Sequence, residues 1–519
     1  AFTRLLGYVR FFHPSQQALR ANWTEFAVRG MRAVESAPDA ESLIATLHSL
    51  FEPVAPSVAI YRTGSTPPPP EPPPPPSPTL GVAMWHHFGF GGGLGGGYRS
   101  TLRRFPAASG RPPAFFRSFK VDSVPAADPQ QPLQVELGGG VSASVPLAVY
   151  TVHGERDDSL APQNPPVPDS TATPDRATRL AVVASLWTVL QHFYPYFDVV
   201  HTNWDSTLAP TLSAAATHAD ADAFDITLER MVAALHDGHA TVYSARRAAS
   251  RAFLGLPPVR LGWVEGRIVV TAVADSAGPT AVRLGDEVVG IDGHPAQDAL
   301  LDRETRTSGA TPGFVRSTAL RRMLLGVPGT TVILRLRDPL DRNAAERDVP
   351  LVRVQRPSFF RERPAKIAEV GQRIIYVDLD RITDADFDGA IPQLERAAGI
   401  IFDMRSYPHP FDAARILATL SDSLLRTAPL EVPLVTQPDH RALRFIDHGW
   451  PLPQGSTRLR APVAFLIGPD AVSGAETTLA IVEAYRLGTT VGAITGGTNG
   501  RANNVSLPGG YGVRFTGQR

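Results

Sequence analysis

Hydrophobic and polar positions along the chain predict three kinds of architecture. Around residues 5–12, apolar side chains recur at three- and four-residue spacing, which predicts amphipathic helices. Apolar and polar residues alternate over 141–150, as they do in half-buried strands, and predict a small β-rich domain. From 372 onward, strand-like and helix-like runs follow one another, which predicts an α/β layer around a largely buried sheet.

An internal repeat covers the helical parts of the sequence. Phe-His-Pro at 12–14 precedes Asn-Trp at 22–23, and Phe-Tyr-Pro at 193–195 precedes Asn-Trp at 203–204. Each copy then ends in a tyrosine at nearly the same distance from its tryptophan. Scattered aromatic residues could match at one position, but the joint spacing predicts a duplicated helical module.

The two copies differ where they end. The first ends with Ala-Pro-Ser-Val-Ala-Ile-Tyr at 55–61, and the second with Asp-Gly-His-Ala-Thr-Val-Tyr at 237–243. His239 therefore stands where the first copy has Ser57. Because duplication often leaves chemistry in one copy only, His239 is a candidate functional residue.

Biased segments separate these modules. The proline tract at 67–78 is typical of a stiff polyproline II linker, and the glycine run at 91–97 of a flexible loop. No Gly-Lys-Ser/Thr follows the glycines, which argues against phosphate binding. The predicted fold class is multidomain α+β, with the units helical copy 1 (1–62), linker and loop (63–112), β-rich domain (113–160), linker (161–174), helical copy 2 (175–250), a separate module (255–354) and an α/β core (356–519).

Composition excludes several functions. Lys+Arg and Asp+Glu are both 50 among 519 residues, so no net charge directs the chain to nucleic acid or to an anionic membrane. No apolar run reaches the roughly 20 residues of a membrane-spanning helix. Cysteine is absent, which excludes disulfides, thiolate catalysis and cysteine-bound zinc. Neither a metal nor a cofactor is predicted.

Lysine is almost absent as well. It occurs only as Lys120 and Lys366, so the other 48 of the 50 basic residues are arginines. Arginine stays protonated and cannot act as a general base. A base in this chain would therefore be a histidine, a carboxylate or one of these two lysines.

Ser473 is the candidate nucleophile. A strand-like run at 463–467 leads through Gly-Pro-Asp to the serine, and a helix-like run follows at 477–486. A serine on such a sharp turn exposes its hydroxyl near backbone N–H groups that can bind an oxyanion. Ser-Gly-Ala-Glu at 473–476 also fits a capping box, in which Ser473 and Glu476 only close the start of a helix. Both interpretations are open at this point.

The module at 255–354 resembles a PDZ domain of the bacterial, protease-associated kind. The segment Val-Arg-Leu-Gly-Asp-Glu-Val-Val-Gly-Ile-Asp-Gly at 282–293 carries the resemblance. PDZ domains take an extended peptide, often a free C-terminus, as an added strand. The resemblance therefore implies a peptide partner, and the alternative is a spacer that binds no peptide.

Residues 174–519 resemble the tail-specific and tricorn-core serine peptidases. The resemblance rests on Asp-x-Arg at 403–405, Ser-Gly-Ala-Glu at 473–476, Thr-Gly-Gly-Thr-Asn-Gly at 495–500 and the glycine-rich strand at 507–517, together with Asp-Gly-His and the PDZ-like module in the family's order. It implies an α/β core with the spiral fold shared by ClpP and crotonase.

The resemblance implies two alternative bases. The tail-specific branch uses a lysine after its serine, but the matching position here is Thr498. The tricorn-like branch uses a histidine before the PDZ domain, and His239 matches it. We therefore expect Ser473 as nucleophile and His239 as base, with His236 as the nearest competitor. Gly238 stands where the tricorn enzyme has a second catalytic serine.

The expected oxyanion hole is the Gly474 N–H with a second backbone N–H from the loop after Arg405. That loop reads Ser-Tyr-Pro-His-Pro at 406–410, where relatives have glycines. Because proline has no N–H, Tyr407 or His409 must donate, and we assign Tyr407. Asp403 and Arg405 are interpreted as a structural ion pair.

The function predicted is a serine peptidase that cleaves unfolded or C-terminal peptide segments through an acyl-enzyme. The family implies a periplasmic or extracellular location, and the chain could form an oligomer. We expect truncation at the C-terminus, with the acid that orients His239 beyond Arg519. The alternative is a catalytically weak protein that binds peptides or hydrophobic ligands on the same scaffold.

Overall fold

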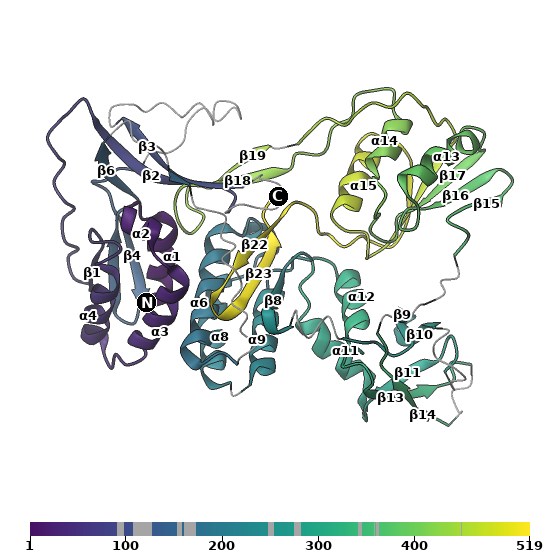
Figure 1. Cartoon of the computed structure of the whole chain (residues 1–519), viewed down its shortest axis with the longest axis horizontal. Helices are drawn as coiled ribbons and strands as arrows, with labels where there is room; N and C mark the ends of the chain where they lie inside the picture. Colours follow the sequence, from purple (N-terminus) through teal and green to yellow (C-terminus); the bar gives the residue numbers. More distant parts are fainter. Residues whose placement is uncertain are drawn as a thin grey trace.

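The structure is a computed structural model of the whole chain with a mixed α+β fold (Figure 1). It describes residues 1–90, 98–106, 127–152, 158–159, 173–218, 220–247, 254–274, 282–340, 345–355, 357, 359, 363–447 and 449–519. Strands in these ranges form five sheets. The glycine run at 91–97 and parts of the predicted β-rich domain, at 113–126, 153–157 and 160, lie outside the described residues.

The first helical module packs its helices beside a small antiparallel sheet. Its elements are α1 (Phe2–Phe12), α2 (Gln16–Arg20), α3 (Trp23–Val34), α4 (Ala40–Phe51), β1 (Ala59–Arg62), β4 (Leu133–Gly138) and β5 (Val141–Val145). The sheet order is β1-β5-β4. The side chain of Asn22 caps α3 by accepting the Glu25 N–H, which explains the Asn-Trp motif.

The second module repeats this plan with strands from the other end of the chain. Its elements are α6 (Arg176–Phe193), α7 (Phe197–Val200), η1 (Trp204–Thr207), α8 (Leu208–Thr217), α9 (Ala221–Ala233), β8 (Thr241–Ser244), β22 (Ala502–Ser506), η3 (Pro508–Gly510) and β23 (Tyr511–Thr516). Asn203 caps η1 as Asn22 caps α3. The sheet order is β22-β23-β8, so the C-terminal hairpin supplies two of its three strands.

The two modules share one hydrophobic core. Helices α1 and α6 pack against each other at its centre, where Leu5, Val9, Val183 and Leu190 are fully buried. Figure 1 shows the first module (purple) beside the second (teal), with the yellow hairpin against the second. Because apolar side chains surround α6 on nearly all sides, this helix has no polar stripe.

A further sheet connects the N-terminal region with the segment 431–447. Its strands are β2 (Leu80–Phe88), β3 (Arg99–Pro106), β6 (Ala148–Val152), β7 (Asp158–Ser159), β18 (Glu431–Val435) and β19 (Arg444–Asp447), in the order β19-β18-β2-β3-β7 with β6 also beside β2. Strands β2 and β3 lie within 63–112, which the sequence analysis assigned to linker and loop. The sequence gives little sign of strand β2, because His86 and His87 count as polar in the pattern. In the structure both histidines are buried like apolar residues.

Residues 254–355 form a separate unit with its own core. Its elements are β9 (Val259–Val264), β10 (Arg267–Val273), β11 (Glu287–Ile291), β12 (His294–Pro295), α11 (Ala296–Thr305), α12 (Pro312–Arg322), β13 (Thr331–Arg337) and β14 (Arg347–Val352). The antiparallel sheet runs β14-β13-β11-β10-β9, and both helices pack on it.

The unit that carries Ser473 has a mainly parallel sheet. Its elements are β15 (Ile367–Gly371), β16 (Ile374–Asp378), α13 (Asp384–Leu394), β17 (Gly399–Asp403), α14 (Ala414–Leu420), β20 (Val463–Ile467), α15 (Gly474–Ala484) and β21 (Thr489–Gly492). Strands β16, β17, β20 and β21 are parallel neighbours, and β15 is antiparallel to β16. Ligands in such sheets bind outside the carboxyl ends of the strands, where Ser473 follows β20.

Candidate active site

All four predicted site residues line one cavity of about 790 Å³. Ser473, Gly474, Tyr407 and His239 are among its lining residues. They come from α15, from the loop after β17 and from the turn before β8. His236 lines a different cavity, of about 600 Å³, and so is separated from the other candidates. Lys366 forms an ion pair with Asp386 on α13, and Lys120 lies outside the described residues.

Ser473 lies on a strained turn between β20 and α15. Its backbone has φ 55° and ψ −115°, a left-handed conformation that costs free energy for any residue with a Cβ. A nucleophile at a strand-to-helix elbow has this kind of conformation, because it lifts the side chain out of the turn. The Ser473 hydroxyl makes no hydrogen bond within the described residues, so neither a cap bond nor a bond to His239 is formed.

The capping-box interpretation of Ser473 and Glu476 is wrong. The Ser473 N–H, which a box would pair with Glu476, donates instead to the Thr498 carbonyl at 2.6 Å. The Glu476 carboxylate accepts the N–H groups of Gly497 and Thr498 at 2.8 and 2.6 Å, and the Thr495 hydroxyl at 2.6 Å. Glu476 therefore holds the loop 495–498 against the start of α15, and that loop in turn holds the Ser473 backbone.

Thr498 is the residue that the sequence resemblance matched to the lysine of the tail-specific branch. It is buried against the turn that precedes His239. A Cβ built on Gly238 would lie 2.1 Å from the Thr498 hydroxyl oxygen. Only glycine fits at position 238 without a shift of Thr498.

His239 is oriented by a hydrogen-bonded chain to a buried carboxylate. Its Nδ1 lies 2.9 Å from the Thr516 hydroxyl, and that hydroxyl donates to Asp237 Oδ1 at 2.7 Å. Because the single hydroxyl proton of Thr516 points to the carboxylate, the Thr516 oxygen must accept a hydrogen bond from the protonated His239 Nδ1. The neutral imidazole then carries its free lone pair on Nε2, as a general base requires.

Asp237 fixes the geometry around His239 through backbone bonds as well. It accepts the N–H of Thr516 at 2.7 Å and the N–H of His239 at 2.9 Å, and its own N–H donates to the Ser308 hydroxyl at 2.9 Å. Asp237 is only 5% exposed, so these hydrogen bonds form in a low-dielectric environment. Sequence reasoning missed Asp237 and Thr516, and the Asp-x-His spacing was the one local signal.

The environment of His239 keeps its ring neutral. Burial lowers the pKa of His239, the Asp237 charge opposes that effect, and the Arg514 charge adds to it. Because the net shift is downward, the imidazole is unprotonated at neutral pH and can accept a proton.

Two backbone N–H groups are available beside Ser473. Neither the Gly474 N–H nor the Tyr407 N–H has an acceptor among the described residues. The Tyr407 side chain lies against Gly474, since its hydroxyl oxygen is 3.1 Å from the point where a Gly474 Cβ would be. Pro408 lines the cavity and offers no donor.

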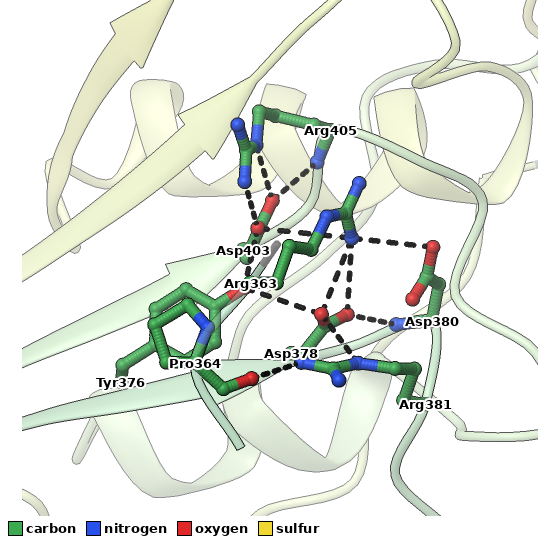
Figure 2. Close-up of polar contacts among 8 residues, drawn as sticks. All are labelled: Arg363, Pro364, Tyr376, Asp378, Asp380, Arg381, Asp403 and Arg405. Carbon is green, nitrogen blue, oxygen red and sulfur yellow. Dashed lines mark hydrogen bonds and ion pairs between the residues drawn. The ribbon is translucent and has the colours of Figure 1, made fainter. Parts of the chain in front are cut away.

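The loop that carries Tyr407 is anchored at the end of β17 by an ion pair between the half-exposed Arg405 and the buried Asp403. Arg405 donates to Asp403 from its guanidinium and from its backbone N–H, which confirms the predicted structural role of this pair (Figure 2). The Tyr376 hydroxyl also donates to Asp403 at 2.6 Å. Burial alone would raise the Asp403 pKa, but the bonds from Arg405 and Tyr376 lower it to about 2.

A second carboxylate lies beside this pair at the end of β16. Figure 2 shows Asp378 between Arg363 and Arg381, with Asp380 next to it. Burial raises the pKa of Asp378, and the neighbouring Asp380 raises it further. The arginines offset this cost, so the cluster fixes the carboxyl ends of β16 and β17 under the loop that carries Tyr407.

Comparison with known proteins identifies the fold. No family model and no curated protein matches the chain. Among solved structures, mature CPAF complexed with lactacystin is 14% identical, with a TM-score of 0.52 over 66% of this chain and 90% of that chain. Mature CPAF without that compound is 15% identical, with the same TM-score over 66% and 89%.

Other solved peptidases are similar over a comparable length. The photosystem II D1 C-terminal processing protease is 16% identical over 66% of this chain and 88% of that chain, with a TM-score of 0.38. None of the helices that the structure describes combines the length and the apolar character needed to cross a membrane. The chain has the fold of the tail-specific protease CPAF, which confirms the resemblance predicted from its sequence.

Proposed function

We propose that this protein is a serine peptidase, with Ser473 as nucleophile and His239 as general base. The observation that carries the proposal is the chain Asp237–Thr516–His239, which ends in the same cavity as a serine on a strained elbow. A histidine that serves only the fold needs no such orientation toward a cavity. The substrate is a peptide, and the PDZ-like unit at 255–354 presents it as an added strand.

The reaction follows from the proton positions. Ser473 Oγ attacks the scissile carbonyl carbon while His239 Nε2 takes the hydroxyl proton. The oxyanion that forms accepts the N–H groups of Gly474 and Tyr407, each of which is worth roughly 3–4 kcal/mol in the transition state. His239 then protonates the leaving amine, and water hydrolyses the acyl-enzyme by the reverse proton path.

Thr516 and Asp237 act on this reaction through His239. When the imidazole gains a proton on Nε2, its positive charge is stabilised by the Thr516 hydroxyl, whose own proton points to the Asp237 carboxylate. The orienting acid therefore precedes the histidine in the sequence. It does not have to be sought beyond Arg519.

Two observations favour a second function, a peptide-binding protein with weak catalysis. Ser473 and His239 form no hydrogen bond within the described residues, and Pro408 and Pro410 restrict the donors near the oxyanion position. Catalytic hydrogen bonds often tighten only when substrate binds, so this geometry does not exclude the peptidase.

A fluorophosphonate probe, which reacts with activated serines, separates the two functions. We expect wild-type labelling that is lost in Ser473→Ala and falls by at least ~100-fold in His239→Ala, since a general base contributes about 10²–10⁴-fold. Ser456→Ala, an exposed serine outside the cavity, is the matched control and should label normally. Labelling that persists in both active-site variants would contradict the peptidase and leave the binding protein.

A further inference from the structure

One wall of the catalytic cavity carries donors that have no acceptors. Arg501, Arg514 and Gln518 all line this cavity. Within the described residues, neither arginine side chain makes a hydrogen bond or an ion pair. Gln518 is 1% exposed, and its amide nitrogen has no acceptor in the same part of the chain. Such a buried donor costs free energy until an acceptor reaches it.

The C-terminal hairpin holds these three residues in fixed positions. Arg501 precedes β22, Arg514 lies on β23 and Gln518 follows β23. Gln518 Oε1 accepts the Arg501 N–H at 2.9 Å, and the Gly517 N–H donates to the Arg501 carbonyl at 2.8 Å. Oε1 already accepts this bond, whereas the NH₂ group of Gln518 has no partner within the described residues.

The charge of the cavity is positive on this wall. Asp412 is the one carboxylate among the described residues that line the cavity. Its Oδ1 accepts the Ala414 N–H at 3.0 Å, at the start of α14. No ion pair between Asp412 and either arginine is present in the described ranges. The field of the two guanidinium groups therefore stays available to a ligand.

We propose that Arg501, Arg514 and Gln518 form a carboxylate subsite next to Ser473. It receives either an acidic side chain of the peptide or its free C-terminal carboxylate. The guanidinium group binds a carboxylate with paired N–H donors, and the Gln518 amide adds a further donor. The subsite deepens the proposed function, because it rests on that function for a peptide as ligand and selects which peptides enter the cavity.

The test measures binding to the full chain carrying Ser473→Ala, so that no peptide is cleaved. Four pools of fluorescent degenerate peptides are compared, with a fixed central Glu or Gln and a C-terminal acid or amide. We expect a carboxylate to tighten binding by about 10- to 100-fold over its neutral counterpart, the range for hydrogen bonds to charged groups. The preferred pool identifies the source of the carboxylate. Equal binding of the four pools, or no binding, overturns the proposal.

Variants assign the preference to the proposed wall. Arg501→Gln and Gln518→Glu should each reduce the carboxylate preference by at least ~10-fold and leave binding of the neutral pool within about 3-fold. Arg460→Gln, an exposed arginine outside the cavity, is the matched control. A preference that survives both changes in the wall would place the carboxylate elsewhere and overturn the proposal.

A second measurement separates this subsite from the peptidase function. Fluorophosphonate labelling of the wild type tests Ser473 as the nucleophile, whereas the binding assay needs no reaction. The peptidase function and the carboxylate subsite can therefore be refuted independently. In Arg514→Gln the loss of positive charge near His239 should move the labelling profile to higher pH, because His239 then protonates more readily. The control Arg460→Gln, which lies outside the cavity, should label as the wild type does.

Discussion

The two helical modules have the same order of elements and differ at the residues next to their closing strands. Extending the register of β8 and β23 places Thr516 opposite His239, and the register of β1 and β5 places Pro146 opposite Ser57. The first module thus has a proline, which cannot serve as a hydroxyl partner, where the second has Thr516. It also has Ala55 where the second has Asp237.

The first module uses its histidine in the core instead. His13 Nε2 lies 2.8 Å from the Ser57 hydroxyl, and Tyr194 occupies the position of His13 in the second module. Burial lowers the pKa of His13 to about 4. The comparison teaches that the scaffold alone does not make the site. Asp237, His239 and Thr516, near the ends of β8 and β23, distinguish the candidate active module from the first module, which contributes only to the core.

The largest expected effect comes from giving the second module the first module's residue. His239→Ser removes the base, and we expect fluorophosphonate labelling to slow by about 10³-fold, within the range for general-base catalysis. Ser57→Ala in the first module is the control and should label as the wild type does. Equal slowing in both variants would mean that the first module also affects the reactivity of Ser473. The contrast between an active and a packing module would then be wrong.

Acid should destabilise the first module through His13. The folded pKa of His13 is about 4 and lies below the unfolded value of 6.5, so the neutral ring stabilises the fold above pH 6.5. This contribution is lost as the pH falls from 6.5 toward 4, and it amounts to roughly 3 kcal/mol. Tyr194 does not titrate in that window.

Urea unfolding of wild type and His13→Phe at pH 7 and pH 4.5 measures this effect. The variant should lose less stability between the two pH values than the wild type does. An equal loss would show that other groups, among them the buried His87 and His192, account for the acid sensitivity.

Asp237→Ala, again the residue of the first module, should slow labelling by about 10²-fold, since the imidazolium loses its carboxylate support. The variant also leaves two N–H groups without their acceptor, so a thermal melt must accompany the assay. Asp237→Asn keeps an acceptor oxygen and should fold better while it stays slow. Wild-type labelling in either variant would remove Asp237 from the mechanism.

The smallest effect is expected at Thr516, which transmits the charge of Asp237. Thr516→Val keeps the shape but breaks the bond to His239, and we expect a loss of about 10-fold, the value of one hydrogen bond. Thr516→Ser should restore the wild-type rate and its pH profile. If serine does not rescue the rate, the methyl group and not the hydroxyl of Thr516 is the important part.

Much of the fold and part of the site could be predicted from local sequence. The elbow at Ser473 and the ion pair of Asp403 with Arg405 each depend on neighbours within a few residues. The bond between His239 and Thr516 joins residues 277 positions apart and depends on how β23 pairs with β8. No local pattern encodes that pairing. The assignment of Ser473, His239, Gly474 and Tyr407 to catalysis stays a prediction.

Other differences have local causes. Ser473 and Glu476 match the capping box in sequence, but the left-handed backbone at Ser473 turns its side chain away from the helix end. Strand β2 was overlooked because buried His86 and His87 look polar in sequence. Serine occurs both as a helix cap and on a strained turn, and histidine occurs both at the surface and in the core. The tertiary structure decides between these environments.

The C-terminal hairpin has a consequence for the order of events during synthesis. Residues 254–500 are made between β8 and its partner β23. A growing chain can fold the serine elbow and the loop that carries Tyr407 before Thr516 has left the ribosome. Until then His239 lacks Thr516 as the partner of its Nδ1, and the proposed carboxylate subsite is incomplete. For the proposed peptidase, activity would therefore begin only when β23 pairs with β8.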